Sequence, residues 1–176
     1  MRFGRPNLHS RKALLPDAVR IHELICHYSP DGTLLPRSLT DICENVRDFV
    51  VVEDNGQVIA CAALHIYALH LAEIRSVAVA REAQGRNAGT KLVQALIAEA
   101  KHHKIARVFL FTRVPEFFGR LGFSQVEHNA LPEKVHKDCL ACPRRNQCDE
   151  IAMVYVGAEK RRQPVQPAAE PVLRVL

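Results

Sequence analysis

The sequence predicts a single mixed α/β domain, and three observations support that prediction. Two apolar runs, 49–52 and 58–67, flank an Asp-Asn-Gly turn at 54–56, which is typical of a β-hairpin. Residues 89–103 repeat apolar side chains at the helical period between later strands. A length of 176 residues allows one sizeable core. Strands joined both by a hairpin and by helices indicate a mixed α/β fold.

Local signals place the other elements. Pro16 and Asp17 favour the start of a helix. Ser38 and Asp41 resemble a capping box that opens a second helix. The expected elements, in chain order, are a strand at 11–14, helices from 16 and from 38 to about 46, strands at 49–52, 58–67 and 71–79, a helix at 89–103, a strand at 108–111, a helix at 115–121 and a strand at 151–156.

The strand expected at 71–79 carries charged side chains inside an apolar run. Strict alternation places successive side chains on opposite faces of a strand. The sequence therefore predicts one face formed by Glu73, Arg75, Val77 and Val79, and another formed by Ile74, Ser76 and Ala78.

The ordered domain is expected to cover residues 11–156. Residues 1–10 are expected to form a flexible N-terminus. Residues 157–176 contain three prolines and a basic triplet, and they are expected to form a flexible tail.

Composition suits an anionic ligand and argues against two classes of protein. The net charge of +5 suits a nucleotide cofactor, and it would also suit nucleic acid. Trp is absent and Tyr occurs three times, so a broad base-stacking platform is not expected. No apolar stretch is long enough to span a bilayer, and no apolar run of signal-peptide type follows the basic N-terminus. These features predict a cytoplasmic protein that binds neither nucleic acid nor membrane.

A strand, a polar turn and a helix follow one another between residues 71 and 103, and this order creates an anion site. The amides of the turn and of the first helical residues have no partner within the helix, and the helix dipole adds partial positive charge. Small residues let a diphosphate approach the backbone, and Arg86 and Lys91 add charge nearby. The pattern alone is also typical of an ordinary strand-to-helix turn.

The turn reads Gln84-Gly85-Arg86-Asn87-Ala88-Gly89, and it resembles the cofactor turn of the GNAT N-acetyltransferase superfamily, Gln/Arg-x-x-Gly-x-Gly/Ala. It departs from that pattern at Asn87, where the family has Gly, but Asn tolerates positive φ well. A second family motif, an aromatic pair leading to Gly-Phe, is present at 117–123. The resemblance covers roughly 11–156. It implies the GNAT fold, with a mostly antiparallel central sheet flanked by helices.

The resemblance also implies acetyl-CoA as the co-substrate and a set of contacts to it. In the family, the strand before the turn pairs through its backbone with the pantetheine arm. The implied cofactor-binding residues are Val77, Ala78, Val79, Gln84, Gly85, Arg86, Asn87, Ala88, Gly89 and Thr90.

Within the superfamily, the sequence resembles the short, stand-alone N-acetylglutamate synthases of bacterial arginine biosynthesis. This likeness extends well beyond the cofactor turn. The segments that carry it are 34–39, 47–49, 62–65, 72–79, 139–143 and 148–154. It implies that the acceptor is the α-amino group of L-glutamate.

Acyl transfer to an amine needs a base, because the free ammonium is mostly protonated at neutral pH. Glu73 lies eleven residues before Gln84, as the catalytic glutamate does in histone-type members, and it is the candidate base, directly or through water. A salt bridge to Arg75 or Arg107 is its alternative role. Arg75 and Arg37 are the candidate anchors for the two carboxylates of glutamate, because a guanidinium binds a carboxylate bidentately.

Two further groups are needed for the reaction. An amide near Val77 is the candidate donor to the thioester oxygen, which gains negative charge in the transition state. Tyr155, Thr112 and water are the alternatives for protonating the departing thiolate.

One histidine and three cysteines lie close together near the end of the domain: His136, Cys139, Cys142 and Cys148. Four such ligands can hold a structural zinc ion in tetrahedral geometry. Reduced thiols are the main alternative, and a disulfide is disfavoured in the cytosol.

The sequence thus predicts an acetyl-CoA:L-glutamate N-acetyltransferase. One alternative is a GNAT enzyme that acts on another amino acid, a polyamine or a protein amine. Another is a nucleic-acid or partner-binding module built on the cysteine cluster and the basic tail. A homodimer and regulation by arginine are left open.

Overall fold

The computed structural model describes residues 8–134, 137, 139–140, 142 and 145–156. The expected C-terminal tail and residues 1–7 lie outside the described residues. Seven strands form one sheet in the order β1-β2-β3-β4-β5-β7-β6. All neighbouring strands are antiparallel except β4 and β5, which are parallel. This arrangement confirms the mixed α/β fold with a mostly antiparallel sheet.

The elements have the following bounds. The strands are β1 Leu8–Lys12, β2 Phe49–Asp54, β3 Gln57–Ala68, β4 Leu71–Val79, β5 Arg107–Thr112, β6 Phe123–Gln125 and β7 Ile151–Tyr155. The α-helices are α1 Ala18–His27, α2 Leu39–Glu44, α3 Ala88–His102, α4 Pro115–Arg120 and α5 Pro132–Lys134. Short 3-10 turns lie at 15–17, 46–48, 81–83, 128–130 and 145–147.

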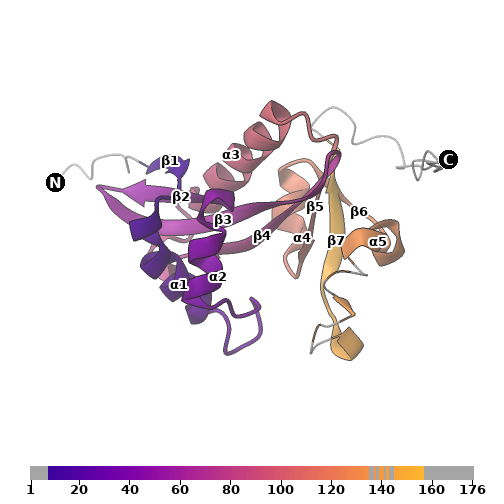
Figure 1. The fold of residues 1–176 in the computed structure, drawn as a ribbon, viewed down its shortest axis with the longest axis horizontal. Helices are drawn as coiled ribbons and strands as arrows, with labels where there is room; N and C mark the ends of the chain where they lie inside the picture. Colours follow the sequence, from indigo (N-terminus) through magenta and orange to yellow (C-terminus); the bar gives the residue numbers. More distant parts are fainter. Residues whose placement is uncertain (1–7, 135–136, 138, 141, 143–144, 157–176) are drawn as a thin grey trace.

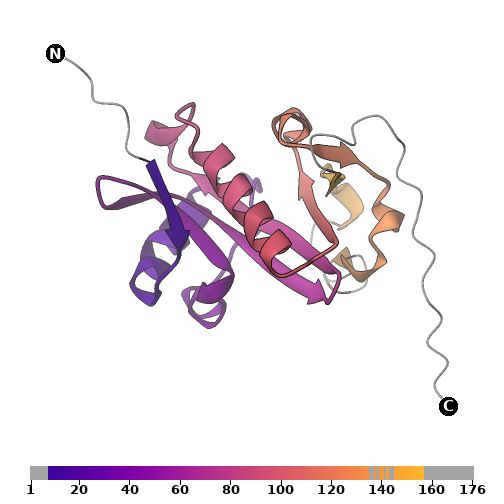
Figure 2. The ribbon, with the colours of Figure 1, turned by 90° about the horizontal axis from the view of Figure 1, so that it is seen from above.

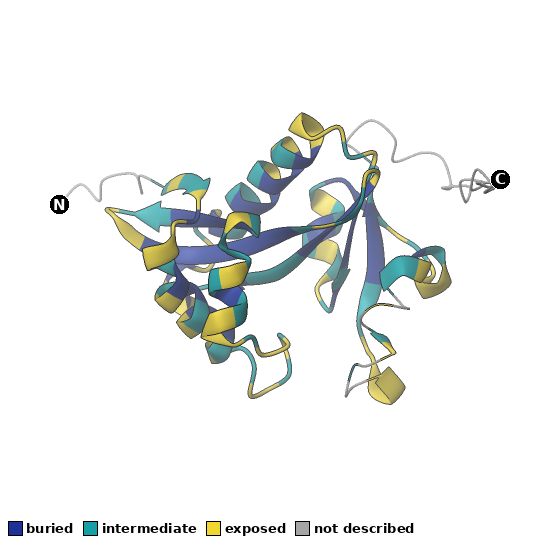
Figure 3. Cartoon of the chain, in the orientation of Figure 1, coloured by how far each residue is buried: buried dark blue, intermediate teal, exposed yellow. Residues whose placement is uncertain are grey.

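The two faces of β1–β4 are covered by different helices. In Figure 2, α3 crosses one face of these strands, and α1 and α2 lie on the other. The inner side of α3 is fully apolar, and each large side chain buried there contributes roughly 1.5–3 kcal/mol. Its buried residues are Ala88, Leu92, Val93, Leu96, Ile97 and Ala100. Figure 3 shows the buried residues concentrated along the strands and on this side of α3.

Two local predictions are confirmed by the backbone. The hairpin turn uses Asn55 at φ 52° and Gly56 at φ 79°, as an Asn-Gly turn requires. The hydroxyl of Ser38 accepts a hydrogen bond of 3.0 Å from the amide of Asp41, which caps α2. None of the helices in the described part of the chain is long and apolar enough to cross a membrane.

One expected boundary is corrected, and one strand was missed. β1 begins at Leu8, so the boundary expected at residue 11 falls inside a strand that pairs with β2 through Asp54. β6 was not expected at all, because a strand of three residues is too short to show a period of two.

The expected faces of β4 are wrong beyond Arg75. Arg75 lies opposite Ala63 and Ala78 lies opposite Cys61, so β4 contains one more residue than β3 over this stretch. Such a β-bulge reverses the alternation, and it falls where Ser76 has φ 55°. Opposite residues share a face, so Ala78 lies on the face of Glu73 and Arg75. Val79 consequently lies on the face of Ile74.

The sheet divides between β4 and β5. These strands pair only from Leu71 opposite Arg107 to Glu73 opposite Phe109. β5 continues along β7 as far as Thr112, whereas β4 continues along β3. Figure 1 shows β4 and β5 running apart, with α4 between them. The separation opens a space at the middle of the sheet.

Candidate active site

A cavity of about 710 Å³ lies where β4 and β5 separate. Its walls come from β4, the turn before α3, the first turn of α3, the end of β5, α4 and the loop between α1 and α2. Glu150, directly before β7, also lines it. The volume suits a small-molecule site.

The cofactor end of the cavity is built by backbone conformation. Asn87 is the N-cap of α3 and has φ 67°, and Gly85 has φ 74°. Asn87 therefore adopts the positive φ that the sequence analysis expected it to tolerate. The amide of Lys91 donates to the carbonyl of Asn87 over 3.0 Å and closes the first turn of α3. The amides of residues 88–90 precede this bond, so they have no helical partner and form an anion site.

Gly89 keeps this helix terminus open. A Cβ atom at Gly89 would lie 3.2 Å from the phenyl ring of Phe117 and 3.7 Å from a methyl group of Val79. A larger side chain there would press against Phe117 and Val79 and would occupy the space in front of the amides.

Most of the predicted cofactor residues line the cavity. They are Val77, Val79, Gln84, Gly85, Asn87, Ala88, Gly89 and Thr90. Ala78 is buried and does not line it. The guanidinium of Arg86 forms an ion pair with Asp54 on the hairpin turn and does not line it either. Contacts of Ala78 and Arg86 with the cofactor stay predictions.

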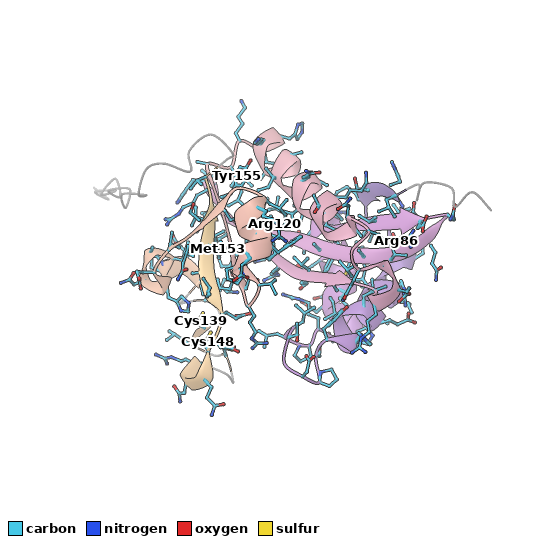
Figure 4. All side chains as sticks on the ribbon, turned by 180° about the vertical axis from the view of Figure 1, so that it is seen from behind. Arg86, Arg120, Cys139, Cys148, Met153 and Tyr155 are labelled. Atoms are coloured by element: carbon cyan, nitrogen blue, oxygen red, sulfur yellow. The ribbon has the colours of Figure 1, made fainter. Side chains whose placement is uncertain are left out.

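Two further residues complete this end, and the sequence did not point to either. The hydroxyl of Tyr28 donates a hydrogen bond to the backbone carbonyl of Val79. It also accepts one of 2.9 Å from the side-chain Nε2 of Gln84, and together these bonds join the end of α1 to the turn. Arg120 on α4 also lines the cavity, and Figure 4 shows it on α4, apart from Arg86. No local signal marks either one, since both belong to ordinary helical segments.

The acceptor end is built around the β-bulge. Arg37 donates from Nε to the hydroxyl of Ser76 over 2.9 Å and from Nη1 to the carboxylate of Asp41 over 2.8 Å. These bonds tie the start of α2 to the bulge. Arg37 does not itself line the cavity, whereas Ser76 does. Its role as a substrate anchor stays a prediction.

Arg75 lines the cavity without a counter-ion. Its Nε is buried and has no hydrogen-bond partner. Within the described part of the chain, no carboxylate lies within ion-pair distance of its guanidinium. A buried N–H group without a hydrogen-bond partner is costly, and a carboxylate bound to this half-buried guanidinium would satisfy it.

Glu73 lies beside Arg75 along β4 but outside the cavity lining. Its carboxylate is almost fully buried and accepts from Lys134 over 2.9 Å and from the hydroxyl of Tyr67 over 3.1 Å. The expected alternative partners, Arg75 and Arg107, do not hold it. Its role as the base stays a prediction, and it needs a water molecule to reach the cavity.

Arg113 and Glu150 line the acceptor end and were missed by sequence reasoning. Arg113 donates to Asp149 over 2.7 Å and to the carbonyl of Gly32, so it connects three segments around the cavity. Burial raises the pKa of Glu150 above its ordinary value, and the charges of Arg113 and Lys134 oppose this shift. Arg113 directly follows β5 and Glu150 directly precedes β7, and these positions are far apart in sequence, so no motif links them.

The structure also separates the candidates for protonating the thiolate. Thr112 lines the cavity, and its hydroxyl accepts a hydrogen bond of 3.0 Å from the amide of Val114. Tyr155 is not part of the lining and packs against Phe123.

The expected zinc site is not supported. His136 lies outside the described residues. Cys139, Cys142 and Cys148 form no disulfide, and Figure 4 shows Cys139 and Cys148 near the start of β7. Within the described residues, no group of three or more His, Cys, Asp or Glu side chains could hold a metal ion.

The sequence matches the Acetyltransferase (GNAT) family over residues 17–123. The chain belongs to this family. It is therefore an acyltransferase, and this favours an enzyme over the alternative of a non-enzymatic binding module. It is 41% identical to an uncharacterized N-acetyltransferase of Chlorobaculum tepidum, over 82% of this chain and 93% of that protein. It is 34% identical to an amino-acid acetyltransferase of Mycobacterium tuberculosis, over 71% of this chain and 73% of that protein.

Solved structures of GNAT proteins share the fold. Rv2747 of Mycobacterium tuberculosis, in complex with CoA and NLQ, has a TM-score of 0.75 and 29% identity, covering 84% of this chain and 98% of that one. N-acetylglutamate synthase of Neisseria gonorrhoeae, complexed with coenzyme A and N-acetyl-glutamate, has a TM-score of 0.76 and 29% identity. The match covers 84% of this chain and 34% of that longer one. Family membership and these CoA complexes support acetyl-CoA binding.

Proposed function

We propose that this GNAT enzyme transfers the acetyl group of acetyl-CoA to the α-amino group of L-glutamate, which gives N-acetyl-L-glutamate and CoA. The observation that carries the proposal is Arg75, a cation that lines the same cavity as the cofactor turn and has no counter-ion among the described residues. A carboxylate-bearing acceptor satisfies it, and a cationic acceptor does not. The amino-acid acetyltransferase of Mycobacterium tuberculosis at 34% identity supports the same acceptor class.

In this proposal, one end of the cavity binds acetyl-CoA and the other end binds the acceptor. The amides at the start of α3 would bind the diphosphate of acetyl-CoA, and β4 would pair with the pantetheine arm through Val77 and Val79. Because β4 leaves β5 after Glu73, its edge is open toward the cavity there. An amide near Val77 would then donate to the thioester oxygen as it gains charge.

The acceptor would lie at the β-bulge, with Arg75 and Arg37 as the proposed anchors for its two carboxylates. Arg37 already bonds Ser76, so a carboxylate at the bulge would need to share or displace that bond. We further propose that Glu73 takes up the amine proton through water. The neutral amine then attacks the thioester carbon, and the carbon–sulfur bond breaks. The nitrogen loses its second proton as the amide forms, and a proton passed through water to the departing thiolate completes CoA. We propose Thr112, whose hydroxyl group belongs to a residue of the cavity lining, as a group that solvates that thiolate.

A panel of acceptors tests the proposal, with release of the CoA thiol as the readout. Glutamine lacks one charge and would leave a cation unpaired, so we expect kcat/KM to be roughly 30- to 150-fold lower than for glutamate, or about 2–3 kcal/mol. Aspartate keeps both charges but is one methylene shorter, so it should also be poor. A preference for glutamine, a polyamine or a protein lysine would contradict the glutamate assignment and leave the acetyltransferase assignment intact.

A further inference from the structure

Some of the charged side chains around the acceptor end form ion pairs with one another, and others do not. Lys134 holds Glu73 at 2.9 Å, and Arg113 holds Asp149 at 2.7 Å. All four of these groups lie close enough to Glu150 to act on its carboxylate electrostatically. The two neighbouring cations are thus already engaged by other carboxylates.

Two side chains of opposite charge, Glu150 and Arg75, have no ion-pair partner among the described residues. The carboxylate of Glu150 makes no hydrogen bond and no ion pair with the described residues, although it is half-buried. The guanidinium of Arg75 likewise has no counter-ion in the part of the chain that the structure describes. Both side chains line the cavity, and they are too far apart to form an ion pair with each other.

The strand register brings these residues to one side of the sheet. Glu73 on β4 lies opposite Phe109, and Phe111 on β5 lies opposite Ala152 on β7. Opposite residues share a face. Arg75 follows Glu73 by two positions and Glu150 precedes Ala152 by two, so both extend the same face where β4 and β5 separate.

We propose that Glu150 and Arg75 form a zwitterion-binding pair, in which Glu150 binds the ammonium group of the acceptor and Arg75 binds the carboxylate next to it. This inference rests on the proposed function, because it assumes that the acceptor amine enters this cavity beside the thioester. It adds the residue that recognises the amine, and it defines the acceptor class as free α-amino acids.

Other amine acceptors leave one of the two charges unsatisfied. A polyamine would pair with Glu150 but would bring a second cation toward Arg75. A lysine side chain within a protein carries no carboxylate next to its amine, so Arg75 would stay unpaired. A molecule that carries both an ammonium and a carboxylate, as a free α-amino acid does, pairs with both of these half-buried groups at once, and leaving either one without a partner is unfavourable.

Glutarate isolates the contribution of Glu150, because it is glutamate without the amino group and keeps both carboxylates. Binding of glutamate and of glutarate would be measured by calorimetry on the full chain saturated with CoA, which prevents turnover. We expect the wild-type protein to bind glutamate at least about 10-fold more tightly than glutarate, as a charge-assisted hydrogen bond predicts.

Glu150→Gln keeps the shape of the side chain and removes its charge. We expect glutamate to bind roughly 10-fold more weakly to this variant and glutarate to bind as well or better, so that the preference falls to near unity. Glu150→Asp keeps the charge and should retain part of the preference. Glu116→Gln is the matched control, because Glu116 is exposed on α4 and outside the cavity lining. An unchanged affinity for CoA shows that each variant is folded.

An unchanged preference for glutamate in Glu150→Gln would overturn the assignment of Glu150. A failure of the proposed function looks different, because the wild-type protein would then acetylate another amine and not glutamate. In that case the same comparison, made between that amine and its analogue without the amino group, decides whether Glu150 binds the amine.

Discussion

At the cofactor end of the cavity, one continuous segment from β4 to α3 supplies most of the site, mainly through backbone groups, and Tyr28 and α4 complete it. At the acceptor end, side chains from β4, β5, α2 and the residue before β7 come together, and most of their charges are paired within the protein. The cofactor end depends on the backbone conformation of a turn. We expect few substitutions to change cofactor binding there, except those that place a large side chain in the space in front of the helix amides. The acceptor end depends on which charges remain unpaired, so single charge changes should affect it strongly.

The largest expected effect tests the cofactor end. Gly89→Trp should abolish acetyl-CoA binding, because its side chain would fill the space between Phe117 and Val79 in front of the helix amides. Calorimetry with acetyl-CoA measures this, and thermal unfolding reports whether the fold is kept. Gly119→Ala is the control, because a Cβ there meets nothing within 4 Å. Unchanged affinity in Gly89→Trp would refute the cofactor site.

The next effect concerns proton transfer at the acceptor end. Glu73→Gln keeps the shape and removes the basic group, so we expect kcat to fall by about 10²-fold or more, with a smaller change in KM. Steady-state kinetics across pH provide the measurement. Rates equal to those of the wild type at every pH would assign proton transfer to water or to another residue, and Glu73 would then be a structural partner of Lys134.

Arg75→Met tests the unpaired cation. Loss of a charge-assisted hydrogen bond to the acceptor should raise the KM for glutamate by roughly 10- to 100-fold, and the affinity for acetyl-CoA should stay the same. Arg47→Met is the matched control, because Arg47 is exposed and outside the cavity lining. If both variants bind glutamate equally well, Arg75 does not anchor the acceptor.

A smaller effect separates two arginines at the cofactor end. Arg120 lines the cavity and is exposed, so Arg120→Met should weaken acetyl-CoA binding by roughly 2- to 5-fold, in the range of exposed ion pairs. Arg86 is engaged by Asp54, so Arg86→Met should change the affinity by less than about 2-fold. Titrations at low and high salt provide the measurement. A larger loss of acetyl-CoA affinity in Arg86→Met than in Arg120→Met would support a direct contact between Arg86 and the cofactor.

The smallest effect concerns folding stability. Burial raises the pKa of Glu150 above its ordinary value of 4.5, so the folded protein holds this proton more tightly than the unfolded chain does. The resulting stability is fully present below pH 4.5 and is lost as the pH rises through the raised pKa. Glu150→Gln should therefore unfold at a higher temperature than the wild type at pH 7, and the difference should shrink toward pH 4. An equal difference at both pH values would contradict this linkage.

The sequence by itself determined the parts of this protein that depend on neighbours in the chain. The hairpin at Asn55 and Gly56, the cap at Ser38 and the left-handed Asn87 each follow from conformational preferences of one or two residues. The strand, turn and helix of the cofactor end were predictable for the same reason, since helix termini carry free amides wherever they occur.

Only the tertiary structure decided the acceptor end. Alternation along β4 could not show the bulge at Ser76, because an extra residue in one strand is defined by the register with its neighbour. Likewise, the sequence contains Glu73, Arg75 and Glu150 without showing that Lys134 pairs with the first of them and leaves the other two unpaired. Charge pairing depends on distances across the sheet, and those are set by the packing of strands that are far apart in the chain.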